Sequence, residues 1–319
     1  MVEGAAFAGV YPMLYAFFDA NGRLDRAAMR AQVDHCVANG AHGIAALGLG
    51  TEVSKLSPEE RRLVMEWAAE DLAGRLPLAI TVFGATPAEQ SAVVRAAAAR
   101  GADWVILQPP QTGASITEDQ LVDFFGTVAD AAPVPVAIQN APQYIGVGLS
   151  SAGLDRLSRD HSNVRLLKAE GSAVETRSLI QLTEGRIEVF QGRGGLEFVD
   201  VLRAGCVGII PSVESCHVQS RMFELMKTGR AADQAEAERL YAQLAPLIVF
   251  LMQSVGQFLC YGKRLTARRL RIAEVHDRAP AQAPTAFGLE CLARHAAVLD
   301  GTAGRWVEGL APRPNPATD

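Results

Sequence analysis

Short apolar runs alternate with segments of helical periodicity along the first two thirds of the chain. Eight runs have the length and character of buried strands, at residues 10–18, 43–47, 78–82, 104–107, 134–138, 164–168, 187–190 and 207–210. Between them apolar residues recur at helical spacing, which predicts helices that begin near residues 25, 57, 86, 117, 151, 173, 196 and 215. One start is typical of a capping box, with Ser57 as the cap, Pro58 in the first turn and Glu60 reaching back.

This alternation predicts an α/β fold with a parallel sheet. Eight near-equal strand–helix units over about 220 residues favour closure as a (β/α)8 TIM barrel, and a doubly wound open sheet is the alternative. Beyond the last unit there is no strand pattern, and helices are predicted at 231–256, 264–275 and 284–298. We therefore expect a barrel over residues 1–230, a C-terminal helical region over 231–300 and a frayed tail over 301–319.

Composition narrows the class of protein. With 319 residues, 49% of them hydrophobic, and a formal charge of −5, the chain can bury a large core and does not resemble a nucleic-acid-binding protein. Its five cysteines are widely spaced without a CxxC pair, which indicates reduced thiols rather than a disulfide framework or zinc site. The longest apolar run, 244–252, is too short to cross a membrane, and no signal peptide is evident. We expect a cytoplasmic protein without membrane or nucleic-acid partners.

The run 164–171, Val-Arg-Leu-Leu-Lys-Ala-Glu-Gly, carries the candidate chemistry. On a strand, Lys168 shares a face with Val164 and Leu166 and lies where the strand stops. A lysine buried there loses hydration, which disfavours the ammonium and frees an amine that can form Schiff bases with ketones. This stretch alone is more typical of a solvated lysine at a strand end. In a barrel, however, active sites lie at the carboxyl ends of the strands, so the fold favours a reactive lysine.

Several motifs together resemble the dihydrodipicolinate synthase/N-acetylneuraminate lyase family of class I aldolases. The resemblance covers roughly residues 7–300 and is carried by Lys168 with its following glycine-containing turn and by four other stretches: Gly9-Val10-Tyr11-Pro12, Gly48-Leu49-Gly50-Thr51-Glu52, Asn140-Ala141-Pro142 and Gly208-Ile209-Ile210-Pro211-Ser212. The resemblance implies a Schiff base between Lys168 and a 2-oxo acid such as pyruvate, without a metal or organic cofactor. It also implies a homotetramer arranged as a dimer of dimers.

In the family, a Gly-Thr-Thr-Gly-Glu loop binds the substrate carboxylate. The matching loop here contains Gly48, Leu49, Gly50 and Thr51, so the hydroxyl pair is missing and the threonine is displaced by one position. We expect the backbone N–H groups of Leu49, Gly50 and Thr51 to form an anion-binding nest in its place. Ile210, in the stretch that resembles the eighth strand, is a further candidate for contact with the substrate.

The fifth strand departs further from the family pattern. The resemblance implies a proton-relaying tyrosine before Asn-x-Pro, but this chain has Gln139 followed by Asn140, and an amide cannot act as a general acid or base. Gln139 and Asn140 are expected to line the pocket. Tyr144 and Glu170 are the candidates for proton transfer or iminium stabilisation, and Arg193 is a candidate for holding the distal acid group of a substrate.

These observations leave three hypotheses. The chain is expected to be a Schiff-base lyase on a pyruvate-type 2-oxo acid or a 2-oxo-3-deoxy sugar acid, catalysing either dehydration or aldol cleavage. Loss of the tyrosine favours elimination, which needs only a base and an acid for the departing hydroxyl. The alternative from another class is a non-catalytic barrel that binds 2-oxo acids as a sensor or scaffold.

Overall fold

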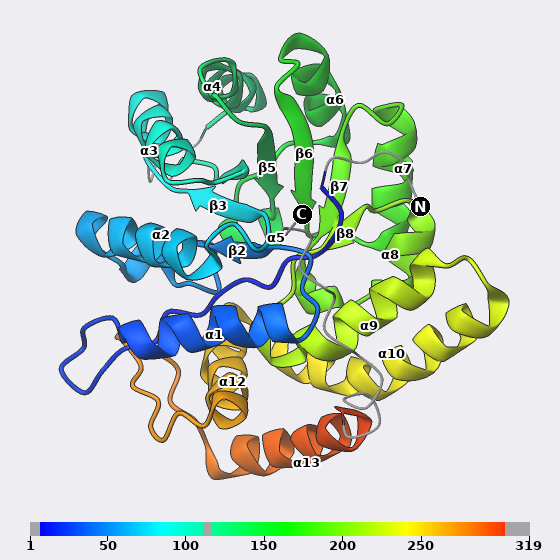
Figure 1. Cartoon of the computed structure of the whole chain (residues 1–319). Coiled ribbons are helices and arrows are strands. Elements are labelled where there is room, and N and C mark those ends of the chain that lie inside the picture. Colours follow the sequence, from blue (N-terminus) through cyan, green and yellow to red (C-terminus); the bar gives the residue numbers. More distant parts are fainter. Residues whose placement is uncertain (1–6, 111–115, 304–319) are drawn as a thin grey trace, which may run out of the picture.

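Parallel strands form one sheet in the computed structural model, which describes residues 7–110 and 116–303. The spatial order is β1-β8-β7-β6-β5-β4-β3-β2, so each strand from β2 to β8 lies beside its neighbours in the sequence (Figure 1). The bounds are β1 Gly9–Val10, β2 Ile44–Ala46, β3 Leu78–Val82, β4 Trp104–Leu107, β5 Val136–Asn140, β6 Val164–Ala169, β7 Glu188–Gln191 and β8 Gly208–Ile209. The predicted eight-stranded barrel is confirmed.

The segment after β1 closes the barrel without forming a continuous strand. Met13 bridges Ala45 of β2 on one side and Ser212 beyond β8 on the other. The N–H of Leu14 donates to the carbonyl of Ala45 at 2.9 Å. The prediction of one strand over residues 10–18 is therefore wrong in extent, since β1 ends at Val10. Pro12 has no N–H to donate, and a strand ladder cannot run unbroken through a proline.

Helices surround the sheet, one after each strand (Figure 1). Their sequences begin with the expected caps; for example, Ser57 accepts from the N–H of Glu60, whose carboxylate accepts from the N–H of Ser57. A short turn, α5 Pro142–Ile145, was not predicted and lies between β5 and α6. The surrounding helices are α1 Arg26–Ala38, α2 Pro58–Leu72, α3 Pro87–Ala99, α4 Glu118–Asp130, α6 Ser151–Asp160, α7 Ala173–Leu182, α8 Phe198–Ala204 and α9 Cys216–Lys227.

The C-terminal helices lie outside this ring, against α9, α8 and α1 (Figure 1). They are α10 Ala231–Leu251, α11 Val255–Gln257, the π-helical turn Phe258–Gly262, α12 Lys263–Leu270 and α13 Ala286–Ala303. The predicted helices 231–256 and 264–275 are too long. The first ends at Leu251, and Ser254 caps a separate turn beyond it. The second ends at Leu270, where Arg271 adopts a left-handed φ of 56°. Among the described helices, no single one is long and apolar enough to span a membrane, although α10 with Val255–Leu270, bent by 110°, passes by length and composition together.

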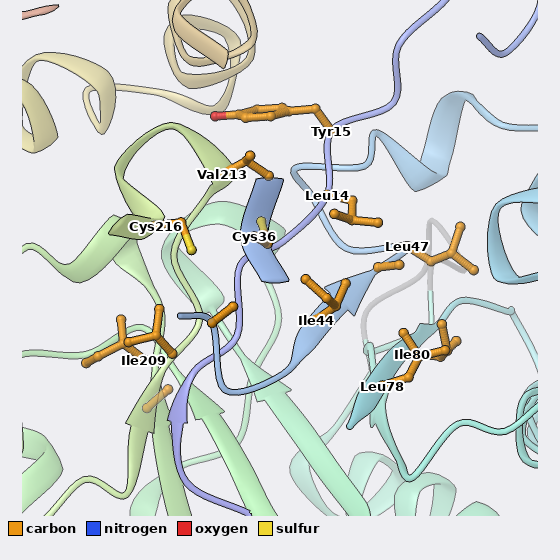
Figure 2. Packing of buried hydrophobic residues seen from close by; sticks show 14 of the residues in the cluster. Leu14, Tyr15, Cys36, Ile44, Leu47, Leu78, Ile80, Ile209, Val213 and Cys216 are labelled. Atoms are coloured by element: carbon orange, nitrogen blue, oxygen red, sulfur yellow. The ribbon is translucent and has the colours of Figure 1, made fainter. Parts of the chain in front are cut away.

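Two apolar clusters fill the molecule. The larger one lies between the sheet and the helices, and Figure 2 shows part of it, with Ile44, Leu78, Ile80 and Ile209 on the strands. The smaller one includes aromatic side chains from three strand regions. Tyr11 meets Trp104 and Phe190 edge-on, and Trp104 stacks on Phe190 with centroids 5.2 Å apart. Phe190 is the register partner of Lys168, so this aromatic cluster extends to the position of the candidate lysine in the barrel.

A buried ion pair fixes the loop after β2 to the C-terminal helices. Glu52 adopts a left-handed φ of 55°, and its side chain is 2% exposed. One carboxylate oxygen accepts from the fully buried Lys263 at the start of α12, and the other accepts from Lys55 at 2.5 Å. Asp277 lies 3.8 Å from the Lys263 ammonium. Because the Gly48–Glu52 loop ends at this carboxylate, α12 sets the position of that loop.

Lys263→Met is expected to lower the free energy of unfolding by about 3 kcal/mol, because it leaves Glu52 buried with one of its two cationic partners. The shift in urea midpoint at constant slope measures this loss. Arg203→Met is the control, since the Arg203–Glu238 pair between α8 and α10 is about half exposed and is expected to contribute less than about 1 kcal/mol. Equal losses in the two variants would contradict a special role for Lys263.

Candidate active site

Lys168 lies inside the barrel near the end of β6 and forms an ion pair with Glu170. The lysine is 6% exposed and the glutamate 4%. The Nζ of Lys168 donates to Oε1 of Glu170 at 2.8 Å. Lys168 lies on β6 and Glu170 is the first residue beyond its end at Ala169, and both line the same pocket. A buried ammonium is stable only beside such a counter-charge, which gives Lys168 a defined position and a proton acceptor.

The loop after β7 holds the other oxygen of Glu170. The backbone N–H of Arg193 donates to Oε2 at 2.6 Å. Gly192 has no side chain because the Glu170 carboxylate occupies that space; a Cβ there would lie 2.2 Å from Oε1. The next glycine, Gly194, turns the chain with a φ of 63°. The sequence prediction singled out this glycine-rich loop for the Arg193 side chain and missed that its backbone binds Glu170.

The Gly48–Glu52 loop provides two free donors instead of three. Leu49 and Gly50 line the pocket that contains Lys168, and over the described ranges neither backbone N–H has a hydrogen-bond acceptor. The N–H of Thr51 donates to the carbonyl of Gly48 at 3.1 Å, and that of Gly48 donates to the sulfur of Met13. The Thr51 hydroxyl donates to the Leu14 carbonyl at 2.6 Å. Both donors of Thr51, which was expected to contact substrate, are thus used within the fold.

Tyr144 and Arg193 stand at the mouth of the pocket beside Glu170. Burial, followed by the negative charge of Glu170, raises the pKa of the Tyr144 hydroxyl, while the nearby Arg193 guanidinium partly offsets the rise. Tyr144 is thus a neutral phenol at pH 7, able to donate a hydrogen bond. The Arg193 guanidinium pairs with Glu197 at 3.1 Å, so its charge is shared between this partner and the pocket.

The amides predicted on β5 have different surroundings. Gln139 is the register partner of Lys168 and is fully buried; its carbonyl oxygen accepts from the Gln108 amide at 3.0 Å, and its own NH2 has no partner among the described residues. It lies inside the barrel but not on the pocket wall. Asn140 was expected to line the same pocket, and this is wrong. Its amide exchanges two hydrogen bonds with the backbone of Leu149, so it orders the connection to α6.

Two polar groups escaped the sequence analysis. Gln108 follows β4 and supports Gln139. Thr81 of β3 is buried, and its hydroxyl has no partner within the described part of the chain. That hydroxyl lies 3.4 Å from the point where a side chain on Gly48 would begin. Gln108 directly follows a strand, and this position, which singled out Lys168, could also have identified it as a candidate. Thr81 lies in an unbroken apolar run, where nothing distinguishes a buried structural threonine.

The pocket is narrow and mostly apolar. Its volume is about 50 Å³, and beyond the residues above its wall is formed by Met13, Gly194, Ile210, Pro211, Ser212, Met252, Val255 and Phe258. Ile210 therefore lies where it was expected. Across residues 7–110 and 116–303, no three His, Cys, Asp or Glu side chains gather as a metal site would require. The five cysteines are free and buried in the structure.

Comparison with known proteins identifies the family. The model of the Dihydrodipicolinate synthetase family matches residues 6–274. The chain belongs to this family. The resemblance found in the sequence is thus confirmed. Members related to this chain are synthases, aldolases and dehydratases that act on pyruvate-type substrates, so the coarse class is an enzyme of the lyase type.

Two relatives and two solved structures show how far the likeness extends. YagE of Escherichia coli K12, which carries the name of a 2-dehydro-3-deoxy-D-gluconate aldolase, is 30% identical over 74% of this chain and 79% of its own. The L-2-keto-3-deoxyarabonate dehydratase of Azospirillum brasilense is 30% identical over 75% and 78%. The structure of YagE with pyruvate superposes with a TM-score of 0.82 at 25% identity, covering 94% and 99% of the two chains. The 4-hydroxy-tetrahydrodipicolinate synthase of Methylacidiphilum fumariolicum shares the fold, with a TM-score of 0.86 at 22% identity and coverage of 96% and 100%.

Thr51→Val is expected to destabilise the fold without weakening ligand binding. It leaves the buried Leu14 carbonyl without its donor, which costs about 1–3 kcal/mol in unfolding free energy. Thr51→Ser keeps the hydroxyl and serves as the matched control. Urea unfolding measures the stability, and titration with pyruvate measures the dissociation constant, which should change less than about twofold. A tenfold weaker affinity for pyruvate in the valine variant alone would show that the hydroxyl contacts the ligand.

Proposed function

We propose that this protein is a lyase that forms a Schiff base between Lys168 and a 2-oxo acid. The observation that carries the proposal is the buried Lys168–Glu170 pair at the pocket, with the free N–H groups of Leu49 and Gly50 on the wall. A nucleophilic amine, a proton acceptor in contact with it and an anion-binding loop are the parts that such a reaction needs.

Schiff-base formation begins with a proton transfer from the Lys168 ammonium to the Glu170 carboxylate. The amine then attacks the C2 carbonyl carbon, and a proton moves from nitrogen to oxygen to give a neutral carbinolamine. Tyr144 donates its proton to that oxygen, which leaves as water, and recovers a proton from Glu170. The product is a cationic iminium beside a carboxylate that is charged again, and this pairing stabilises the iminium.

The substrate carboxylate fits the loop after β2. The carboxylate accepts hydrogen bonds from the backbone N–H groups of Leu49 and Gly50, which donate to no other acceptor in the described part of the fold. Gln139 is level with Lys168 but lies behind the pocket wall, so its amide is assigned no contact with the substrate. Arg193 is the candidate for contact with the distal end of the substrate.

The iminium allows two reactions of a 2-oxo-3-deoxy sugar acid. In dehydration, a base removes a proton from C3, and the resulting enamine expels the C4 hydroxyl. In aldol cleavage, the C4 hydroxyl loses a proton and the C3–C4 bond breaks. Formation of 2-oxoglutarate semialdehyde from a 2-oxo-3-deoxy pentonate reports the first reaction, and pyruvate release reports the second.

A second candidate is a barrel that binds 2-oxo acids without turnover. The observation in its favour is the Gln108–Gln139 pair, because neither amide can exchange protons at neutral pH. In that case the pocket recognises the acid through the Leu49 and Gly50 N–H groups and stops there. Covalent trapping separates the two functions.

Borohydride reduction in the presence of pyruvate is expected to attach a reduced pyruvate adduct to Lys168. A buried amine with an adjacent proton acceptor forms the iminium that borohydride reduces. Intact mass spectrometry and peptide mapping locate the adduct. Lys168→Ala should abolish it, whereas Lys227→Ala, at the exposed end of α9, should leave it unchanged. The absence of an adduct with pyruvate and with 2-oxo-3-deoxy sugar acids would overturn the lyase proposal in favour of the binding protein.

Tyr144→Phe is expected to slow adduct formation by about 100-fold, the usual effect of losing one proton-transfer group. Pyruvate affinity should change little, because the ring remains. Quenched-flow borohydride trapping gives the rate. Tyr241→Phe is the matched control, since the Tyr241 hydroxyl donates to the Leu196 carbonyl away from the pocket. Equal trapping rates in the Tyr144 variant and wild type would exclude Tyr144 as the proton carrier.

A further inference from the structure

A second carboxyl group, that of Glu214, lies just beyond β8 behind the pocket wall. Ser212, just beyond β8, lines the pocket and is 2% exposed. Its hydroxyl donates to Oε1 of Glu214, which is also 2% exposed. The Tyr15 hydroxyl donates to Oε2 of Glu214 at 3.1 Å. Figure 2 shows Tyr15 beside Val213, the residue between Ser212 and Glu214. Glu214 thus contacts the pocket through one serine hydroxyl.

Glu214 has no ion-pair partner within the described residues, in contrast to Glu170. Burial raises the pKa of its carboxyl group, and hydrogen bonds from Ser212, its own N–H and Tyr15 offset only part of the rise. The Arg269 guanidinium on α12 also acts to lower it, while Tyr15 and the Cys36 thiol on α1 are the other titratable groups that face it. The carboxylic acid therefore persists to higher pH than that of an exposed glutamate.

The two carboxyl groups at this pocket are set up for opposite tasks. Glu170 is paired with an ammonium and a backbone N–H, which suits a charged base. Glu214 accepts from two hydroxyls and has no paired cation among the described residues, and its burial suits a proton donor. Environments that separate two carboxyl groups in this way identify the base and the acid of a reaction. When Glu214 is protonated, its O–H donates to the Ser212 oxygen, and the serine O–H is released toward the pocket.

We infer that Ser212 and Glu214 form a proton relay that protonates the departing hydroxyl, which makes dehydration of a 2-oxo-3-deoxy acid the reaction of this site. The inference rests on the proposed Schiff base at Lys168. Ser212 is the catalytic residue, since it touches the pocket, and Glu214 acts through it. Aldol cleavage would begin by taking a proton from the C4 hydroxyl, for which a protonated acid is the wrong starting state.

The step balances with groups on the chain. Glu170 removes a proton from C3 of the iminium, which gives the neutral enamine. The nitrogen lone pair re-forms the C2–nitrogen double bond, a C3–C4 double bond forms, and the C4–oxygen bond breaks. The departing oxygen takes the Ser212 proton and leaves as water, while Ser212 takes the proton of Glu214. Afterwards Glu170 loses one proton to solvent and Glu214 regains one, so both groups return to their starting states.

Steady-state dehydration and borohydride trapping, measured on the same full-length variants, test the relay. Glu214→Gln keeps the shape and hydrogen bonds of the side chain but has no acidic proton. Ser212→Ala removes the link, and Ser212→Thr restores a hydroxyl. We expect kcat for semialdehyde formation to fall about 100-fold in the first two variants and to recover at least tenfold in the third. Trapping of pyruvate on Lys168 should stay within twofold of wild type. Ser220→Ala, a buried serine on α9 away from the pocket, is the control and should leave both rates unchanged.

The pH profile separates a relay from a structural role. A general acid must be protonated, so wild-type kcat should fall as pH rises through the pKa of the acid, and this basic limb should disappear in Glu214→Gln.

Normal dehydration in Glu214→Gln, or a basic limb that persists there, overturns the relay while the Schiff base stands. Equal loss of trapping and dehydration also overturns it, because that result indicates a collapsed pocket. Pyruvate release as the only activity of wild type refutes dehydration. Failure of trapping in wild type refutes instead the Schiff base itself.

Discussion

The burial of Lys168 beside Glu170 is the constraint on which the rest of the site depends. An ammonium and a carboxylate this far from water are stable only if each has its partner and the remaining carboxylate oxygen has a donor. The loop after β7 supplies that donor through the Arg193 N–H, and Gly192 leaves the space that the carboxylate fills. The glycine-containing loop after β7 is therefore shaped around this ion pair.

The same principle fixes the other side of the pocket. Glu52 ends the loop that carries Leu49 and Gly50, and its buried carboxylate binds Lys263 of α12. The C-terminal helices thereby act on the site, although they lie outside the barrel. A loop with a glycine at two of its positions would otherwise be free to move, and Leu49 and Gly50 would lose their fixed place on the pocket wall.

Much of this arrangement follows from the sequence, and the failures have physical causes. Strand number, barrel closure and the place of Lys168 follow from periodicity, because buried parallel strands read as short apolar runs between capped helices. The first strand was drawn too long because residues 10–18 are apolar throughout, although Pro12 interrupts the ladder. Thr51 and Asn140 resemble substrate ligands in sequence, but Leu14 and Leu149 take their hydrogen bonds. These hydrogen bonds depend on where the backbone of Leu14 and Leu149 lies in the folded chain, which the residue pattern does not specify.

Loss of a tyrosine on β5 need not remove acid–base chemistry from a barrel, since the carboxyl ends of other strands open onto the same space. Gln139 can donate a hydrogen bond there but cannot exchange a proton. Besides the Tyr144 phenol, two carboxyl groups come from the ends of β6 and β8: Glu170, paired with Lys168, and Glu214, buried behind Ser212. With a base and an acid on separate strands, proton removal at one carbon and departure of a hydroxyl from the next need no shared relay. Elimination requires both a base at one carbon and an acid for the hydroxyl on the next, whereas one proton-carrying group is enough for aldol cleavage.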